Sequence, residues 1–107
     1  MSYYFTTELH CTFEEAIAKA EEKLKDNGFG VLSEINVHDK LKEKLDVDFR
    51  RYRILGACSP RHAYRALTLE NKIGTMLPCN VIIQEINDSD IEVAAIDPQA
   101  SMVAVEN

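Results

Sequence analysis

A short segment, Thr12-Phe13-Glu14-Glu15, begins the strongest helix signal in this sequence. It has the pattern of a capping box, in which Thr12 accepts a hydrogen bond from the Glu15 amide while the Glu15 carboxylate reaches back to the Thr12 amide. Apolar side chains then recur at helical spacing as far as Leu24, and charged side chains fill the other positions. Asn27-Gly28 ends the helix, because glycine tolerates the left-handed backbone that closes a helix. A helix with one apolar face needs a second layer to pack on.

The segments on either side of this helix predict strands that would form that layer. Residues 3–9 are rich in aromatic and β-branched types. Residues 30–37 alternate, which places Val31, Ser33, Ile35 and Val37 on one side and Leu32, Glu34 and Asn36 on the other. Residues 52–58 predict a third strand whose alternate members, Tyr52, Ile54, Gly56 and Cys58, share a face. Residues 77–86 and 91–96 predict a hairpin.

Shorter helical signals lie between and after these strands. Residues 39–45 predict a one- or two-turn helix or an ordered loop. Ser59-Pro60 combines an N-cap residue with proline at the first helical position, which predicts a helix to about Glu70 with Ala63, Ala66 and Leu67 turned inward. Asp97-Pro98 repeats that arrangement and predicts a short final helix.

The order of elements is therefore β-α-β-(short α)-β-α-β-β-α, which predicts an α+β fold in one domain, residues 1–107. We expect a mostly antiparallel sheet of about five strands with the helices packed on one face. A chain of 107 residues is long enough to bury roughly two-thirds of its unfolded surface in a single core.

The overall charge and hydropathy exclude some classes of function. The formal net charge is −6, whereas general nucleic-acid binding requires a positive surface. No apolar run approaches the 18 or so residues that cross a bilayer, and no secretory signal is visible, so we expect no membrane partner and a cytoplasmic location. The three cysteines, Cys11, Cys58 and Cys79, have no CxxC spacing and should be reduced thiols.

Four segments together resemble a bacterial and archaeal family, the domain of unknown function 302. They are Gly28-Phe29-Gly30-Val31, Tyr52 to Pro60 (YRILGACSP), Leu77-Pro78-Cys79-Asn80-Val81 and Asp97-Pro98. The resemblance implies a sheet like that of the TATA-box-binding protein with helices on one side, and a homodimer, but no known activity. Relatives continue into a longer final helix. If that helix covers apolar sheet surface, a shorter one should leave a patch that favours pairing with another chain.

All five arginines fall within residues 50–65, and no Asp or Glu lies between Phe49 and Leu69. This window carries +5, so the remainder of the chain carries −11. A helix N-terminus attracts anions, and guanidinium groups add bidentate donors. The sequence therefore predicts a small-anion site formed by Arg53, Ser59, Arg61 and the neighbouring residues Cys58, His62, Cys79 and Asn80. Alternatively, the arginines pair with the surplus carboxylates, across an interface for example.

The cysteines of this window suggest a second hypothesis. A thiol near a helix N-terminus ionises more readily, and His62 follows Cys58 by four residues. If their strands are neighbours, Cys58 and Cys79 could bind a soft metal, or act in a thiol-dependent redox enzyme with Cys58 as nucleophile, Cys79 as resolving thiol and His62 as base. Alternatively, both cysteines are simply buried packing residues.

The sequence predicts no dedicated metal site and indicates no particular cofactor. A structural zinc site needs four grouped ligands, and the available cysteines and histidines contain no ligand pair at the usual spacing. Three hypotheses therefore remain open. The first is a homodimeric binding module for a small anion, or less favourably a soft metal. The second is the thiol enzyme, and the third is an interaction domain without a ligand.

Overall fold

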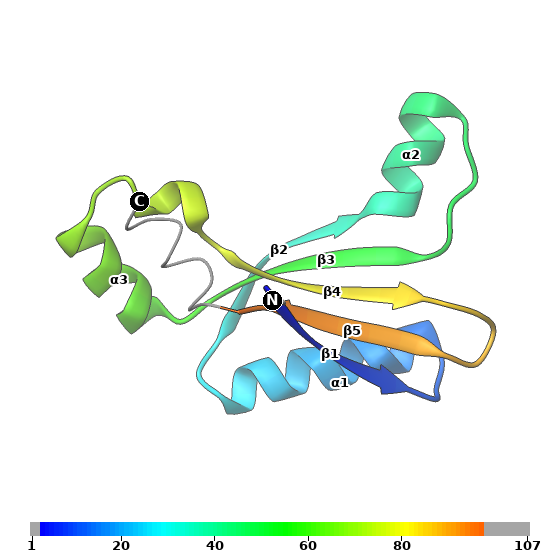
Figure 1. Cartoon of the computed structure of the whole chain (residues 1–107), viewed down its shortest axis with the longest axis horizontal. Coiled ribbons are helices and arrows are strands. Elements are labelled where there is room, and N and C mark those ends of the chain that lie inside the picture. Colours follow the sequence, from blue (N-terminus) through cyan, green and yellow to red (C-terminus); the bar gives the residue numbers. More distant parts are fainter. Residues whose placement is uncertain (1–2, 98–107) are drawn as a thin grey trace.

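The computed structural model describes residues 3–97. Its five strands form one antiparallel sheet with the spatial order β1-β5-β4-β3-β2 (Figure 1). This architecture and its element order confirm the predicted α+β class. The elements are β1 (Tyr4–Leu9), α1 (Phe13–Asp26), β2 (Gly30–Asn36), α2 (Val37–Leu45), β3 (Tyr52–Cys58), α3 (Pro60–Leu69), the 3₁₀-helix η1 (Ile73–Met76), β4 (Cys79–Glu85) and β5 (Ile91–Ile96). The final helix predicted from Pro98 lies outside the described residues.

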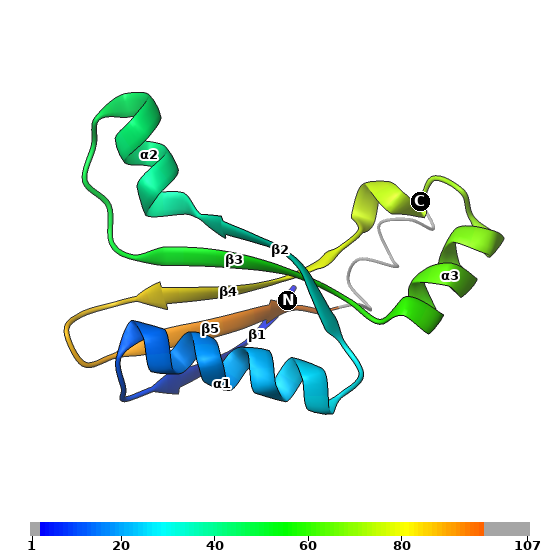
Figure 2. The same ribbon diagram turned by 180° about the vertical axis from the view of Figure 1, so that it is seen from behind.

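Helix α1 crosses one face of the sheet, as Figure 2 shows. The predicted capping box is present, since Thr12 Oγ1 accepts from the Glu15 amide at 3.1 Å and Glu15 Oε1 accepts from the Thr12 amide at 3.3 Å. The apolar stripe of α1 contributes Phe13, Ala16 and Ile17 to the hydrophobic core. The sheet contributes Leu55 from β3, Val81 and Ile83 from β4, and Ile91 from β5. The second face of the sheet carries no helix across it in either view (Figures 1 and 2).

Strand register decides which residues point to each face. Leu55 pairs with Val81, and Val81 pairs with Ala95, so these three share the α1 side. Ile54, Ile82 and Ala94 form the adjacent row and lie on the open face. The predicted alternation of β2 is wrong at one position, because a β-bulge at Leu32 shifts the register between Val31 and Ser33. Val31 consequently faces α1, whereas Ser33 and Ile35 are on the open face.

The two shorter α-helices extend from the sheet rather than lying across it. Helix α2 follows β2 directly and begins at Val37, two residues earlier than predicted. Helix α3 leaves the other end of β3 after the single residue Ser59 and projects beyond the sheet beside η1 (Figures 1 and 2). Of the residues predicted to turn inward on α3, Ala63 and Ala66 are half-buried, whereas the prediction is wrong for Leu67, which is 42% exposed. Among the described elements, η1 is the one that α3 contacts most.

No helix within residues 3–97 is both long and apolar enough to cross a membrane.

Candidate functional site

The arginines that cluster in the sequence lie on different surfaces of the molecule. Arg50 Nε donates to Gln84 Oε1 at 2.8 Å, on the open face of the sheet. Arg53 lies near the start of β3, where its Nε donates to Asn36 Oδ1 at 2.8 Å and Glu34 is 3.9 Å away. Arg61 and Arg65, on α3, form no ion pair or hydrogen bond with another described residue. Arg53 therefore lies at the opposite end of β3 from Cys58 and is already engaged.

Arg51 joins α1 to the end of β4. Its guanidinium donates to Glu14 and to Glu85 Oε2, the latter at 2.8 Å, and stacks 4.9 Å from the centre of the Phe13 ring. The hydrogen bond with Glu85 is the main cause that raises the pKa of Arg51. The pKa of Glu14 is lowered, first by a hydrogen bond from its own backbone amide and then by Arg51. This guanidinium has a structural role and is not available to a ligand.

The predicted thiol pair is brought to neighbouring strand ends, but not to one face. Cys79 pairs with Ala57, so it points to the α1 side of the sheet, and the next residue of β3, Cys58, points to the open face. Both thiols are free and half-buried. Burial is the larger cause that raises the pKa of Cys79, and the nearby charge of Cys58 is the smaller. A raised pKa reduces the thiolate fraction at neutral pH, which works against Cys79 as a nucleophile.

The N-terminus of α3 has the predicted start but not the predicted cluster of side chains. Ser59 is the N-cap and Pro60 follows it, yet the Ser59 side chain makes no capping hydrogen bond. His62 is exposed on α3, and Asn80 lies on the open face opposite Gly56. Of the predicted ligand-binding residues, Cys58, Ser59, Cys79 and Asn80 share the region where β3 ends and β4 begins, with Arg61 and His62 on the adjoining helix.

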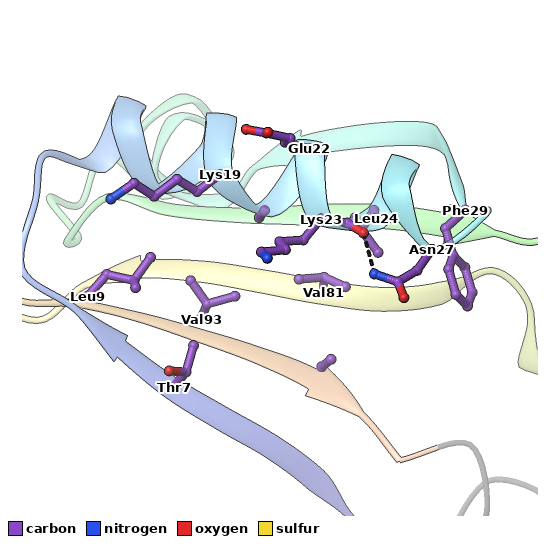
Figure 3. A pocket seen from close by; sticks show the side chains of 12 residues that line it. Thr7, Leu9, Lys19, Glu22, Lys23, Leu24, Asn27, Phe29, Val81 and Val93 are labelled. Atoms are coloured by element: carbon purple, nitrogen blue, oxygen red, sulfur yellow. Dashed lines mark hydrogen bonds between the residues drawn. The ribbon is translucent and has the colours of Figure 1, made fainter.

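An apolar cavity of about 540 Å³ lies between α1 and the β1–β5 side of the sheet (Figure 3). Helix α1 contacts β2, β4 and β5 more closely than the edge strand β1, which leaves the β1 side of the sheet less covered. Its walls come from the helix, the strands and the loop after the helix, and they comprise Thr7, Leu9, Ala20, Leu24, Phe29, Val81, Val93 and Ala95.

Two lysines stand at the mouth of this cavity. Lys19 and Lys23 extend from the sheet-facing edge of α1 above the strands, and Glu22, from the same helix, also lines the cavity (Figure 3). No carboxylate among residues 3–97 lies within ion-pair distance of either ammonium. Asn27 also lines the cavity, and its Nδ2 donates to the Lys23 carbonyl oxygen at 2.7 Å, which holds the helix end in place. An apolar interior is thus combined with an opening where two lysines outnumber the one carboxylate, Glu22.

Sequence reasoning missed this cavity. The apolar stripe of α1 predicts a helix face that packs on the sheet, but the stripe does not say how far along the sheet the helix extends. One signal is visible in retrospect: Ala20 and Ala95, which both line the cavity, are small. The lysine spacing, i and i+4 on one helix edge, is the other signal.

A second polar group occurs at the β1–β5 edge. Atoms of Glu8, His10 and Asp90 lie within 4.8 Å of one another. His10 Nδ1 is 2.8 Å from Asp90 Oδ1, and Asn87 Nδ2 donates to Asp90 Oδ2 at 2.7 Å. The hydrogen bond from Asn87 and then that from His10 lower the pKa of Asp90. Both carboxylate oxygens of Asp90 are therefore occupied in the β4–β5 turn, which makes this group part of the hairpin.

The fold and the cavity together define a small α+β domain with an open-faced sheet and a pocket under its first helix. The sequence matches the family described as "Domain of unknown function DUF302" over residues 5–107, and the chain belongs to that family. This confirms the resemblance seen in the sequence, while the comparison with the TATA-box-binding protein stays a prediction.

A solved structure, the crystal structure of the uncharacterized conserved protein DUF302 from Bacillus stearothermophilus, is similar to this chain with a TM-score of 0.89 and 30% sequence identity. The similarity covers 100% of this chain and 83% of that chain. A search of curated proteins found no match.

Proposed function

We propose that this domain is a binding module for a small anion with an apolar body, held in the cavity between α1 and the sheet. The observation that carries the proposal is the pairing of an apolar cavity of about 540 Å³ with the ammonium groups of Lys19 and Lys23 at its mouth, which have no ion-pair partner among residues 3–97. Ligand pockets typically occupy about 300–1,000 Å³ and combine apolar walls with a few polar groups that fix orientation. A carboxylate with a hydrocarbon or aromatic tail matches both features.

This proposal keeps the class of ligand expected from the sequence, a small anion, and changes its location. The arginine-rich window offers Arg61 and Arg65 on an exposed helix, whereas the α1 cavity combines apolar volume with two lysines at its mouth. An ammonium group acts as a strongly hydrated point charge that suits a carboxylate at a solvent-exposed mouth. The reduced cysteines fit a cytoplasmic location, which we propose for the domain.

A homologous series of straight-chain carboxylates tests this function. Each methylene buried in an apolar site contributes about 0.8 kcal/mol, or roughly a fourfold change in dissociation constant. Isothermal titration of the full chain with butyrate through decanoate should therefore show affinity that rises with chain length and levels off once the cavity is filled. The corresponding alcohols, which lack the charge, should bind more weakly at each length.

Lysine variants provide the matched comparison. Lys19→Gln combined with Lys23→Gln should weaken carboxylate binding by about tenfold, because each substitution removes one charge at the mouth. Lys25→Gln, on the same helix but outside the cavity lining, should leave binding unchanged. If Lys25→Gln weakened binding equally, the loss would come from the overall charge of the protein and not from the cavity mouth. Absence of binding at every chain length would contradict the proposal.

A second candidate site lies where β3 meets α3. Cys58 and Cys79 lie at adjacent ends of neighbouring strands, which keeps a thiol-dependent role for Cys58 open, although their opposite faces do not favour Cys79 as its resolving partner. Cys58 would be the reacting thiol there, because burial keeps Cys79 protonated to higher pH. Alkylation of Cys58 at pH 7 no faster than that of free cysteine would remove this candidate.

Addition of millimolar phosphate tests whether the same region binds an anion at Ser59 and Arg61. An unchanged melting temperature would count against an anion site there.

A further inference from the structure

Three side chains that can bind metal ions meet where the end of β1 lies beside the turn between β4 and β5 (Figure 1). One nitrogen or oxygen atom from each of Glu8, His10 and Asp90 lies within 4.8 Å of the other two. Within residues 3–97, no other group of three His, Cys, Asp or Glu side chains is gathered in this way. The group combines an imidazole with two carboxylates, which is a mixed nitrogen and oxygen donor set of the kind that binds zinc in proteins.

The register of the sheet explains how these residues come together. Glu8 and His10 are two residues apart at the end of β1, so both side chains leave the same face of this edge. Leu9 pairs with Ile91 in β5, and the next position along each antiparallel strand places His10 beside Asp90. His10 and Asp90 are 80 residues apart in the sequence, so ligand spacing along the chain could not indicate a metal site here.

The carboxylates at this edge have no lysine or arginine partner among residues 3–97. Neither Glu8 nor Glu92 forms an ion pair there, and Asp90 pairs with His10 alone. Glu8 lies directly opposite Glu92 across the two strands, and Glu92 accepts a hydrogen bond from a neutral donor, Gln84 Nε2, at 2.8 Å. Like charges directly opposite each other destabilise a sheet. A divalent cation at this edge would offset that repulsion.

We propose that Glu8, His10 and Asp90 bind one zinc-type divalent metal ion, which cross-links β1 to the β4–β5 hairpin. The hydrogen bonds of Asp90 do not exhaust its carboxylate, because the two oxygens offer about four lone-pair sites. Asn87 Nδ2 donates to Asp90 Oδ2 at 2.7 Å and orients the group, while Oδ1, now 2.8 Å from His10 Nδ1, can turn to the ion.

The present spacing of the ligand atoms is close to what such an ion requires. Ligand atoms at about 2.1 Å from a tetrahedral ion lie about 3.4 Å from one another. Glu8 and His10 are exposed, so rotation of their side chains can close the remaining distance without a change in the backbone. Three protein ligands leave the fourth position of a tetrahedral ion to water.

Isothermal titration of the full chain with Zn²⁺ tests this site, and thermal melts with and without Zn²⁺ give a second readout. One ion should bind per chain and raise the melting temperature, because the ion binds the folded state. Glu8→Gln and His10→Gln should each weaken Zn²⁺ binding by about tenfold or more, since loss of a residue that merely orients a ligand already costs that much. The Glu8 side chain makes no hydrogen bond within residues 3–97, so its substitution leaves the hairpin intact.

Two matched variants serve as controls. His62→Gln, on the exposed face of α3, and Asp88→Asn, in the same β4–β5 turn, should leave Zn²⁺ binding unchanged.

Three outcomes would overturn the proposal. The first is the absence of Zn²⁺ binding to the full chain. The second is binding that neither Glu8→Gln nor His10→Gln weakens, since the ion would then be held elsewhere, for example by thiols. The third is equal affinity for Ca²⁺ and Zn²⁺. Because Ca²⁺ prefers oxygen ligands and gains little from an imidazole, equal affinity would indicate only a general attraction of cations to acidic side chains.

Discussion

Arg51 Nη2 lies 2.8 Å from Glu85 Oε2, and this ion pair ties the start of β3 to the end of β4. The same guanidinium reaches Glu14 in the first turn of α1, so one side chain connects the helix with two strands. Replacing Glu85 by Gln should lower the free energy of unfolding by about 0.5–1 kcal/mol, because the pair is partly exposed and screened by solvent. Urea denaturation at pH 7 measures the change, and Asp88→Asn, in the exposed turn, serves as the control. A larger loss for Asp88→Asn would contradict the assignment.

The carboxylates in this network and in the β4–β5 turn predict acid sensitivity. The pKa of Glu14 is lowered from 4.5 and that of Asp90 from 3.8, so both groups stabilise the folded state above these ordinary values. That stabilisation is lost as the pH falls through the lower folded-state values. Stability should thus decline below about pH 4.5. Glu14→Gln should flatten part of this decline, as pH-dependent thermal melts would show. A decline of the same steepness in the variant would assign it to other groups.

Gly56 occupies a position where no side chain fits. A Cβ there would lie 2.3 Å from Ser33 Oγ and 2.8 Å from Pro78 Cγ. The serine oxygen can rotate away, but the ring of Pro78 is rigid and cannot. Gly56→Ala should therefore destabilise the fold by about 1–3 kcal/mol. Gly30→Ala, whose Cβ would come only within 3.9 Å of the Cys58 carbonyl oxygen, is the control for the same substitution in the sheet. Equal stability of the two variants would refute the steric argument.

Local signals in the sequence were sufficient for most of the fold. The structure confirms three such features: the capping box at Thr12, the helix start at Ser59-Pro60 and the β4–β5 hairpin. Each of them depends on residues that are close together in the sequence. The bulge at Leu32 was missed because it arises from pairing with β3, which local alternation does not encode. The inward position expected of Leu67 on α3 was wrong for a similar reason: amphipathic spacing shows that a helix has an apolar face, not which surface covers it.

The candidate site was harder to predict than the fold. The arginine window is dense along the chain, but alternation in β3 and the turn into α3 send its side chains in different directions. The α1 cavity depends on where a helix crosses a sheet, which is a property of tertiary packing. The distribution of charge along the sequence therefore identified the positive residues but could not identify the cavity beside α1.

Cys79 should react slowly with alkylating reagents near neutral pH. Its pKa is raised above 9.0, chiefly by burial and secondarily by the charge of Cys58, so its thiolate forms only in more alkaline solution. Mass spectrometry of iodoacetamide labelling between pH 7 and pH 10 should show the Cys79 adduct increasing late in this range. Cys58→Ser should move that increase to slightly lower pH, since it removes the smaller cause. Rapid labelling of Cys79 at pH 7 would contradict the burial seen here.

Ala20 provides the sharpest test of the α1 cavity, because a larger side chain at this position would occupy the space itself. Ala20→Phe should fill the apolar volume and raise the free energy of unfolding by about 0.5–2 kcal/mol, as cavity-filling substitutions commonly do. The same variant should abolish binding of the straight-chain carboxylates. Ala18→Phe, an exposed position on the same helix, is the matched control and should change neither property. If Ala20→Phe raised stability while carboxylates still bound, the cavity would be real but the ligand would lie elsewhere.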